Sequence, residues 1–156
     1  MMSVRRTREE TPSGFTLIEL LIVVAIIGII SAIALPNLLN AIDKGKQKKS
    51  MSDLRTIGTA IEAYATDTAV YPLSMANWTA LKPIIDPYFI KQPPDADGWN
   101  NAWDASTAAD GSNYTLASYG KDGILSTRGG GQTTDFNCDI LFSGGRFFQW
   151  PEGSQS

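Results

Sequence analysis

The sequence predicts an α+β fold in which a long N-terminal helix packs on a small antiparallel β-sheet. Three observations indicate this fold. An apolar run extends from Phe15 to Leu35, apolar residues then recur at three- and four-residue spacing over positions 51–64, and β-rich runs follow from Tyr114. The first two patterns are typical of helices and the third is typical of strands.

The apolar run is long enough to cross a membrane. Its 21 residues, Phe15 to Leu35, would span about 31 Å as a helix, close to the thickness of a bilayer hydrocarbon core. A single charge, Glu19, interrupts the run. A charge at the centre of a membrane helix costs about 2.5–3.5 kcal/mol on insertion scales, and such residues are usually paired. We therefore predict a transmembrane helix over residues 15–36 and a partner for Glu19.

The next stretch is amphipathic. Its apolar side chains share one face of a helix: Met51, Leu54, Ile57, Ile61 and Tyr64. Polar and charged residues occupy the other faces, so we predict an amphipathic helix over residues 37–66 that docks on a domain. Pro36 lies between the two helical stretches and lacks a backbone donor, and it is expected to kink or loosen the helix there.

Residues 67–156 are predicted to form one small globular domain, because their number leaves room for a single core. A short helix is expected around residues 77–82 and a strand from Tyr114 onward. The run over residues 139–150 predicts a β-hairpin, because two consecutive glycines at its centre suit the positive backbone angles of a tight turn.

Composition argues against ordinary catalysis and against nucleic-acid binding. The chain has no histidine and a single cysteine, Cys138, which removes the usual general base and excludes an internal disulfide. From Asp67 onward there are ten acidic and five basic residues, a net charge of −5, which does not suggest a nucleic-acid-binding patch. We expect a protein that is not an enzyme, and we expect Cys138 to be a packed thiol rather than a reactive one.

Three interpretations of the N-terminus compete. A secretory signal peptide would combine the Arg-rich start with the small residues "AIA" and would be cut after Ala34. The apolar run is longer than the roughly 7 to 15 residues of such peptides, and Glu19 would be costly in a discarded segment. A plain membrane anchor is the second interpretation, but lysines after the run rival the arginines before it, so the positive-inside rule does not orient the chain.

The third interpretation comes from a resemblance. The stretch "SGFTLIELLIVVAIIGIISAIALPNLL" resembles the class III signal and N-terminal helix of type IV pilins and type II secretion pseudopilins, with matches at Gly14, Phe15, Thr16, Leu17, Glu19 and Pro36. In that family a prepilin peptidase removes the leader, here residues 1–14, by cutting between Gly14 and Phe15, and it methylates the new amine. The resemblance implies that this amine approaches Glu19 of a neighbouring subunit, so that assembly neutralises the carboxylate. In the alternative, Glu19 only reaches the lipid headgroups.

The resemblance implies a structural function. The chain is most similar to the major pseudopilins of type II secretion. It would therefore have a pilin-like fold and be a single-pass protein of the bacterial inner membrane, with its C-terminal domain in the periplasm, that polymerises into a helical pseudopilus and drives protein export. The implied partners are copies of itself, minor pseudopilins, the prepilin peptidase, an inner-membrane assembly platform and membrane lipid before assembly, with no nucleic acid.

Two other functions remain open. The first is a type IV pilin used for adhesion, motility or DNA uptake, although type IVa pilins usually close a C-terminal loop with a disulfide that one cysteine cannot form. The second is a membrane-tethered binding domain that never polymerises.

Two further stretches resemble pseudopilins. "DGWNNAW", residues 97–103, is similar to a stretch written D-P-W-G-N-P-Y, although both prolines are missing. We expect its two tryptophans, Trp99 and Trp103, to fill the core of the globular domain. The second stretch is a Gly-rich loop near Cys138.

This loop is expected to bind calcium. A structureless loop of about twenty residues needs a reason in a compact domain, and Ca²⁺ takes six to eight oxygen ligands. Asp122, Asp135 and Asp139 would supply carboxylates, but the pattern alone is weak. "SYGKDG" followed by "CDI" is similar to the calcium loop of the major pseudopilins, in which Asp122 and Asp139 match well and Asp135 less securely. The resemblance implies a structural Ca²⁺; the alternative is a loop held by turns and Asp caps alone.

Overall fold

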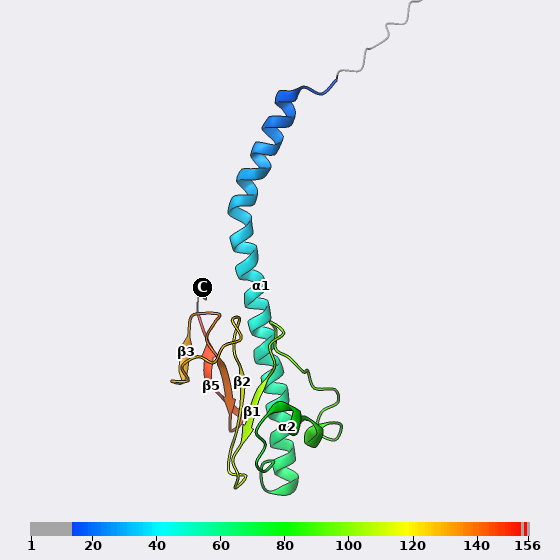
Figure 1. The fold of residues 1–156 in the computed structure, drawn as a ribbon, viewed down its shortest axis with the longest axis vertical. Helices are drawn as coiled ribbons and strands as arrows, with labels where there is room; N and C mark the ends of the chain where they lie inside the picture. The colour runs from blue at the N-terminus through cyan, green and yellow to red at the C-terminus, as the bar shows by residue number, and fades with distance from the viewer. Residues whose placement is uncertain (1–13, 154, 156) are drawn as a thin grey trace, which may run out of the picture. The chain divides into compact units, whose positions relative to one another are not determined.

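The structure, a computed structural model, describes residues 14–153 and residue 155. It confirms the α+β class. The described elements follow one another as α1 (Leu17–Thr68), α2 (Trp78–Ile85), β1 (Asp104–Thr107), β2 (Tyr114–Ser118), β3 (Gly131–Thr133), β4 (Ile140–Ser143) and β5 (Arg146–Pro151) (Figure 1). The chain comprises two compact units, Met1–Asn37 and Leu38–Ser156. Residues 1–13 of the predicted leader lie outside the described residues.

The helix α1 continues through Pro36, where the sequence predicted a kink or a loosened turn. Because proline has no amide hydrogen, the carbonyl of Ala32 loses its usual helical donor at this point. At the next residue, the side-chain Nδ2 of Asn37 donates to the carbonyl of Ile33 at 3.3 Å. The boundary between the two compact units falls directly after Asn37. The helix ends at Thr68, two residues beyond the predicted end.

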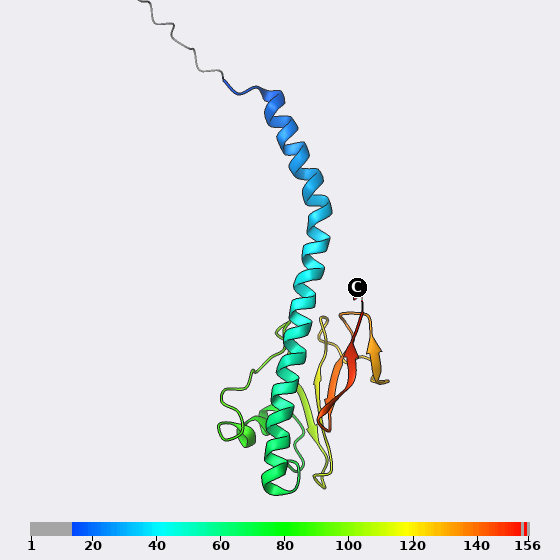
Figure 2. The ribbon, with the colours of Figure 1, turned by 180° about the vertical axis from the view of Figure 1, so that it is seen from behind.

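The core of the second unit forms where α1 packs on the sheet (Figures 1 and 2). Leu54 and Ile57 are fully buried and share one cluster with Leu116 of β2 and Phe142 of β4. The three- and four-residue spacing of the apolar residues therefore does identify the buried face of this part of α1, as predicted.

The sheet has the order β1-β2-β4-β5-β3. It is mixed, whereas the sequence predicted an antiparallel sheet. The pairs β1–β2, β2–β4 and β4–β5 are antiparallel, but β3 runs parallel to β5, with Gly131 opposite Gln149. The difference arises in the Gly-rich loop, which was expected to be structureless and instead contributes β3 to the sheet edge. Figure 2 shows β3 beside β5 at that edge.

Two local predictions are confirmed. The hairpin between β4 and β5 turns at Gly144 and Gly145, whose φ values of 55° and 76° are accessible to glycine at no steric cost. The short helix α2 starts where expected, because the Oδ1 of Asn77 caps it by accepting a hydrogen bond from the amide of Ala80 at 2.9 Å.

The two tryptophans of residues 97–103 differ in how deeply they are buried. Trp103 is buried in the core, as predicted. Trp99 is only half-buried, and its indole N–H donates to the Oδ1 of Asp43 on α1 at 3.1 Å. The ring therefore lies at the edge of the domain and not inside it.

Candidate functional site

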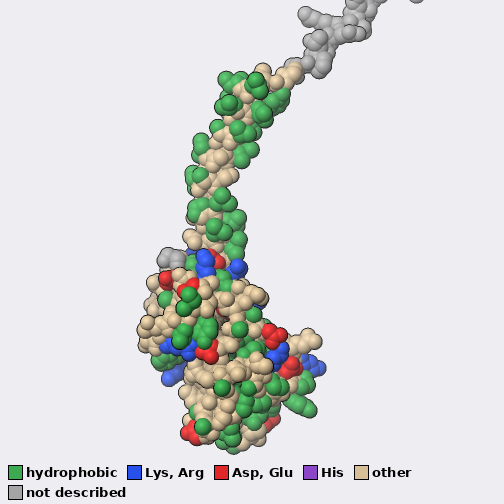
Figure 3. Space-filling model, in the orientation of Figure 1, with side chains coloured by type: hydrophobic (Ala, Val, Ile, Leu, Met, Phe, Trp, Pro, Cys, Tyr) green, Lys and Arg blue, Asp and Glu red, His purple; other side chains and the backbone are tan. Residues whose placement is uncertain are grey.

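The N-terminal half of α1 is a continuous apolar surface. Each large apolar side chain from Phe15 to Leu35 is at least 46% exposed, and green side chains cover this segment in Figure 3. The helix is long and apolar enough to cross a membrane by length and composition. An exposed apolar surface of this extent marks a site that contacts lipid or other protein chains.

The helix begins with a capping box. Thr16 donates both its amide, at 2.9 Å, and its hydroxyl, at 2.6 Å, to Oε2 of Glu19, and the amide of Glu19 donates back to the Thr16 hydroxyl at 3.3 Å. These bonds satisfy amide groups that a helix start leaves without partners. Among the described residues, no donor reaches the other carboxylate oxygen, Oε1. Glu19 therefore has one oxygen that fixes the helix start and one that is open to a further partner.

The predicted cleavage point lies just outside this cap. Gly14 and Phe15 precede the first helical residue, Leu17, and the Phe15 side chain is 78% exposed. No heavy atom lies within 4 Å of the position where a side chain on Gly14 would begin. The peptide bond between Gly14 and Phe15 is thus outside regular structure.

In the second unit, the turn 97–101 is built around a buried carboxylate. Asp97 is 3% exposed. Its Oδ1 accepts hydrogen bonds from the amides of Trp99, at 2.9 Å, and Asn101, at 2.8 Å, and its Oδ2 accepts one from the Ser118 hydroxyl at 2.6 Å. This set of bonds ties the turn to β2.

The same turn makes a close backbone contact with α1. The amide of Gly98 donates to the Ser50 hydroxyl at 2.9 Å, and a Cβ at position 98 would lie 2.1 Å from the carbonyl oxygen of Lys46. We expect Gly98→Ala to destabilise the domain by about 1–3 kcal/mol, because the backbone must move to relieve the overlap. Gly129→Ala is the matched control, since its Cβ would meet no atom within 4 Å. Equal unfolding midpoints in urea for the two variants would contradict this account.

Asp43 on α1 anchors the start of the Gly-rich loop. The Lys121 ammonium donates to its Oδ2 at 2.8 Å. This bond lowers the pKa of Asp43 and outweighs burial, which raises it; the Trp99 indole N–H also lowers it. A carboxyl whose pKa is lower in the folded state adds stability above its unfolded pKa, and this stability is lost as pH falls through the folded value.

This pKa shift predicts how stability depends on pH. We expect the domain to lose stability as pH falls below the usual aspartate value of about 4, with a shallower loss in Asp43→Asn. The check is a series of urea unfolding curves across this acidic range. Lys121→Met should show the same shallower loss, because it removes the other partner. Identical slopes in the wild type and both variants would contradict the role of this pair.

The three predicted calcium ligands do not form a cluster. Asp122 and Asp135 each accept a hydrogen bond from the amide two residues on, at 3.0 and 2.9 Å. Asp139 is fully buried and is paired with Arg128. In the part of the chain that the structure describes, no group of three such side chains is placed to hold a metal ion. This arrangement does not fit a calcium shell, and calcium binding stays a prediction.

Cys138 lies beside the buried Asp139. Burial, together with the charge of Asp135, raises the pKa of the Cys138 thiol. A thiol with a raised pKa stays protonated at neutral pH, and the protonated form is the unreactive one. This favours the expected packed thiol.

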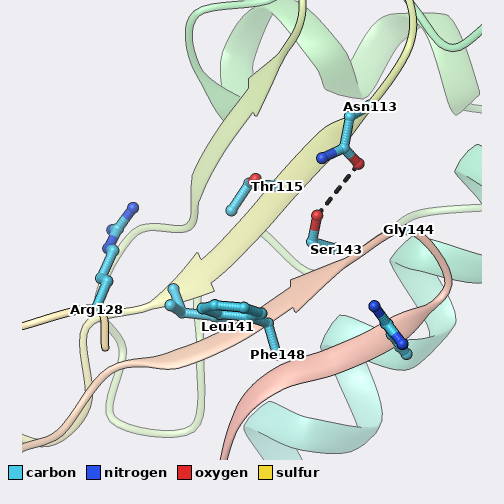
Figure 4. A pocket seen from close by; sticks show the side chains of 8 residues that line it. Asn113, Thr115, Arg128, Leu141, Ser143, Gly144 and Phe148 are labelled. Carbon is cyan, nitrogen blue, oxygen red and sulfur yellow. Dashed lines mark hydrogen bonds between the residues drawn. The ribbon is translucent and has the colours of Figure 1, made fainter. Parts of the chain in front are cut away.

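A pocket of about 680 Å³ lies on the face of the sheet opposite the core, since its lining residues alternate with core residues along β2 and β4. Leu141 and Phe148 lie together in it and Arg128 stands at one side (Figure 4). The other lining residues are Asn113, Thr115, Ser143, Gly144 and Arg146. The lining thus combines two apolar side chains with two arginines and three neutral polar side chains, and Arg128 reaches it from the loop between β2 and β3.

The fold and the N-terminal segment together define a pilin-like subunit. Its features are a Gly–Phe junction, a capped apolar helix with one carboxylate, and a small α+β domain built on the continuation of that helix. Two family models match the chain: the prokaryotic N-terminal methylation motif over residues 12–35, and type II secretion system protein G over residues 37–137. The chain belongs to the type II secretion system protein G family.

Curated relatives agree with this assignment. The type II secretion system core protein G of Escherichia coli K12 is 32% identical over 124 residues, which cover 73% of this chain and 85% of that protein. The proteins of the same name from Vibrio cholerae and Pseudomonas aeruginosa are each 31% identical, over 77% and 71% of this chain and 86% and 84% of their own lengths. No solved structure gives a significant match. The family is a structural part of a secretion system and not a known class of enzyme.

The sequence did not reveal the structural roles of two side chains. Thr16 caps the apolar helix, and its signal was present, since Thr-x-x-Glu before an apolar run predicts a capping box. Arg128 pairs with Asp139 and Asp104, which lie 11 and 24 residues away in the sequence. No local sequence pattern predicts such a pairing.

Proposed function

We propose that this chain is the major subunit of a type II secretion pseudopilus. A prepilin peptidase cuts it between Gly14 and Phe15 and methylates the new amine. The subunit is held in the inner membrane by residues 15–36, with its C-terminal domain in the periplasm, and an inner-membrane platform then adds it to a helical filament that includes minor pseudopilins. The filament drives protein export.

The exposure of the apolar side chains on the N-terminal half of α1 is the observation that supports this proposal most strongly. Its exposed side chains need lipid before assembly and neighbouring helices after it. The open Oε1 of Glu19 supports an ionic partner such as the Phe15 amine of the next subunit, because a carboxylate in apolar surroundings is stable only when paired.

Deletion of the gene tests the proposed function. We expect the medium of the deletion strain to lose secreted proteins that the parent strain exports, and we expect a plasmid copy of the gene to restore them. The alternative, a type IV pilin, predicts normal export together with loss of surface attachment, motility or DNA uptake. Normal export in the deletion strain would therefore contradict the proposal.

A further inference from the structure

We infer that the guanidinium of Arg128 supplies the positive charge that holds the Gly-rich loop, so that the loop folds without a divalent cation. The side chain of Asp139 is fully buried at the entrance to β4. A buried carboxylate needs a compensating charge, which a metal ion or a basic side chain provides.

Arg128 provides that positive charge and pairs with two carboxylates at once. Its Nε donates to Oδ2 of Asp139 at 3.1 Å, and its Nη2 donates to Oδ2 of Asp104 on β1 at 2.8 Å. The guanidinium also lies over the Tyr119 ring, 5.6 Å from its centroid, where a cation is attracted to the aromatic face. Arg128 thus joins the loop to the first residue of β1 and the last residue before β4.

The remaining oxygen of Asp139 is also occupied. Oδ1 accepts the amide of Ser126 at 3.1 Å and its hydroxyl at 2.9 Å, and the Ser126 hydroxyl accepts the amide of Asp139 at 3.0 Å. Gln149 of β5 donates to the carbonyl of Asp139 at 2.8 Å. These bonds close the loop between positions 126 and 139 with protein groups alone.

A calcium ion would have to replace these bonds. Asp122 and Asp135 already accept hydrogen bonds within their own turns. An ion bound to Asp139 would lie close to the Arg128 guanidinium, and two cations at such a distance repel each other strongly in a partly buried site. The cation position of this loop is therefore taken by a side chain of the protein.

The experiment compares melting of the purified full-length protein in detergent with millimolar calcium and with excess chelator. Tryptophan fluorescence follows the globular unit alone, because all four tryptophans lie after residue 77. We expect the wild type to melt at the same temperature in both conditions. Arg128→Met should lower the melting temperature by roughly 10 °C in chelator, because it leaves a buried carboxylate without its partner.

Arg146→Met is the matched control. Arg146 is an arginine that lines the sheet pocket together with Arg128. Because its side chain is exposed, its loss should leave the melting temperature unchanged. A rise of several degrees when calcium is added to the wild type would overturn the inference and restore a calcium site at Asp122, Asp135 and Asp139. An unchanged melting temperature in Arg128→Met would also overturn it. If Arg128→Met does not fold, the melting temperatures of the wild type with calcium and with chelator still test whether the loop needs a divalent cation.

Discussion

Glu19→Gln is expected to leave the protein in the membrane and to abolish filament formation. Glutamine can replace glutamate in a capping box, so the helix start is kept, and removal of a charge favours membrane insertion. The Phe15 amine of the neighbouring subunit, however, loses its counter-charge. An unpaired buried charge costs about 3–5 kcal/mol, which would weaken subunit addition by more than about a hundredfold. The measurement is the amount of protein in sheared filaments relative to the membrane fraction.

Thr16→Ala is the control for the helix start. It removes the cap but keeps the Glu19 charge, and losing a cap costs only about 1 kcal/mol. We therefore expect Thr16→Ala to assemble far better than Glu19→Gln. Normal filament yield from Glu19→Gln would contradict the ionic pairing and would favour a Glu19 that only caps its own helix or reaches the lipid headgroups.

Asp97→Ala is expected to be the most destabilising substitution in the globular unit. It leaves three donors, from Trp99, Asn101 and Ser118, without their buried acceptor. Each unsatisfied buried donor costs about 1–3 kcal/mol, so we expect a loss of about 4 kcal/mol in the free energy of unfolding. This would lower the melting temperature by roughly 15 °C, measured by tryptophan fluorescence.

Two matched variants check this explanation. Asp97→Asn keeps an oxygen that can accept from the two amides, and the Ser118 hydroxyl can rotate to accept from the new NH₂ group, so the loss should be less than half as large. Asp95→Ala removes a mostly exposed carboxylate whose only ionic partner among the described residues is Lys82, and such pairs contribute about 1 kcal/mol or less. Equal destabilisation by Asp97→Ala and Asp95→Ala would contradict the role of the buried carboxylate.

The parts of the fold that were predicted are those encoded by neighbouring residues. The buried face of α1 follows from the spacing of Leu54, Ile57 and Ile61, and the hairpin follows from Gly144 and Gly145. Both are short-range patterns with a direct steric or hydrophobic cause.

The parts that were missed depend on residues far apart in the chain. The strand β3 is only three residues long and contains glycine, so its sequence shows no strand preference, and its pairing with β5 sets its position. The ion pairs of Arg128 likewise arise only when β1, the loop and β4 meet. The acidic residues of the loop predicted a cation, but their spacing did not reveal the ion pair between Asp139 and Arg128. Calcium binding itself stays a prediction.

The candidate assembly residues were predicted from the N-terminal motif, but the geometry added a second role to one of them. Glu19 was expected to pair with a neighbouring subunit, and that pairing remains a prediction. The structure places the same carboxylate in the cap of its own helix. A single subunit cannot display a contact that forms only between subunits, so the two roles must be separated by the variants described above.

The most direct test of the central claim is the intact mass of the protein recovered from filaments. If residues 1–14 are a leader and the apolar helix is the filament core, the recovered chain begins at Phe15 and carries one extra methyl group. A chain that begins at Leu35 would instead show that the apolar run is a secretory signal peptide. A filament of chains that still begin at Met1 would equally contradict the account, because no free amine would then be present at Phe15 to pair with Glu19.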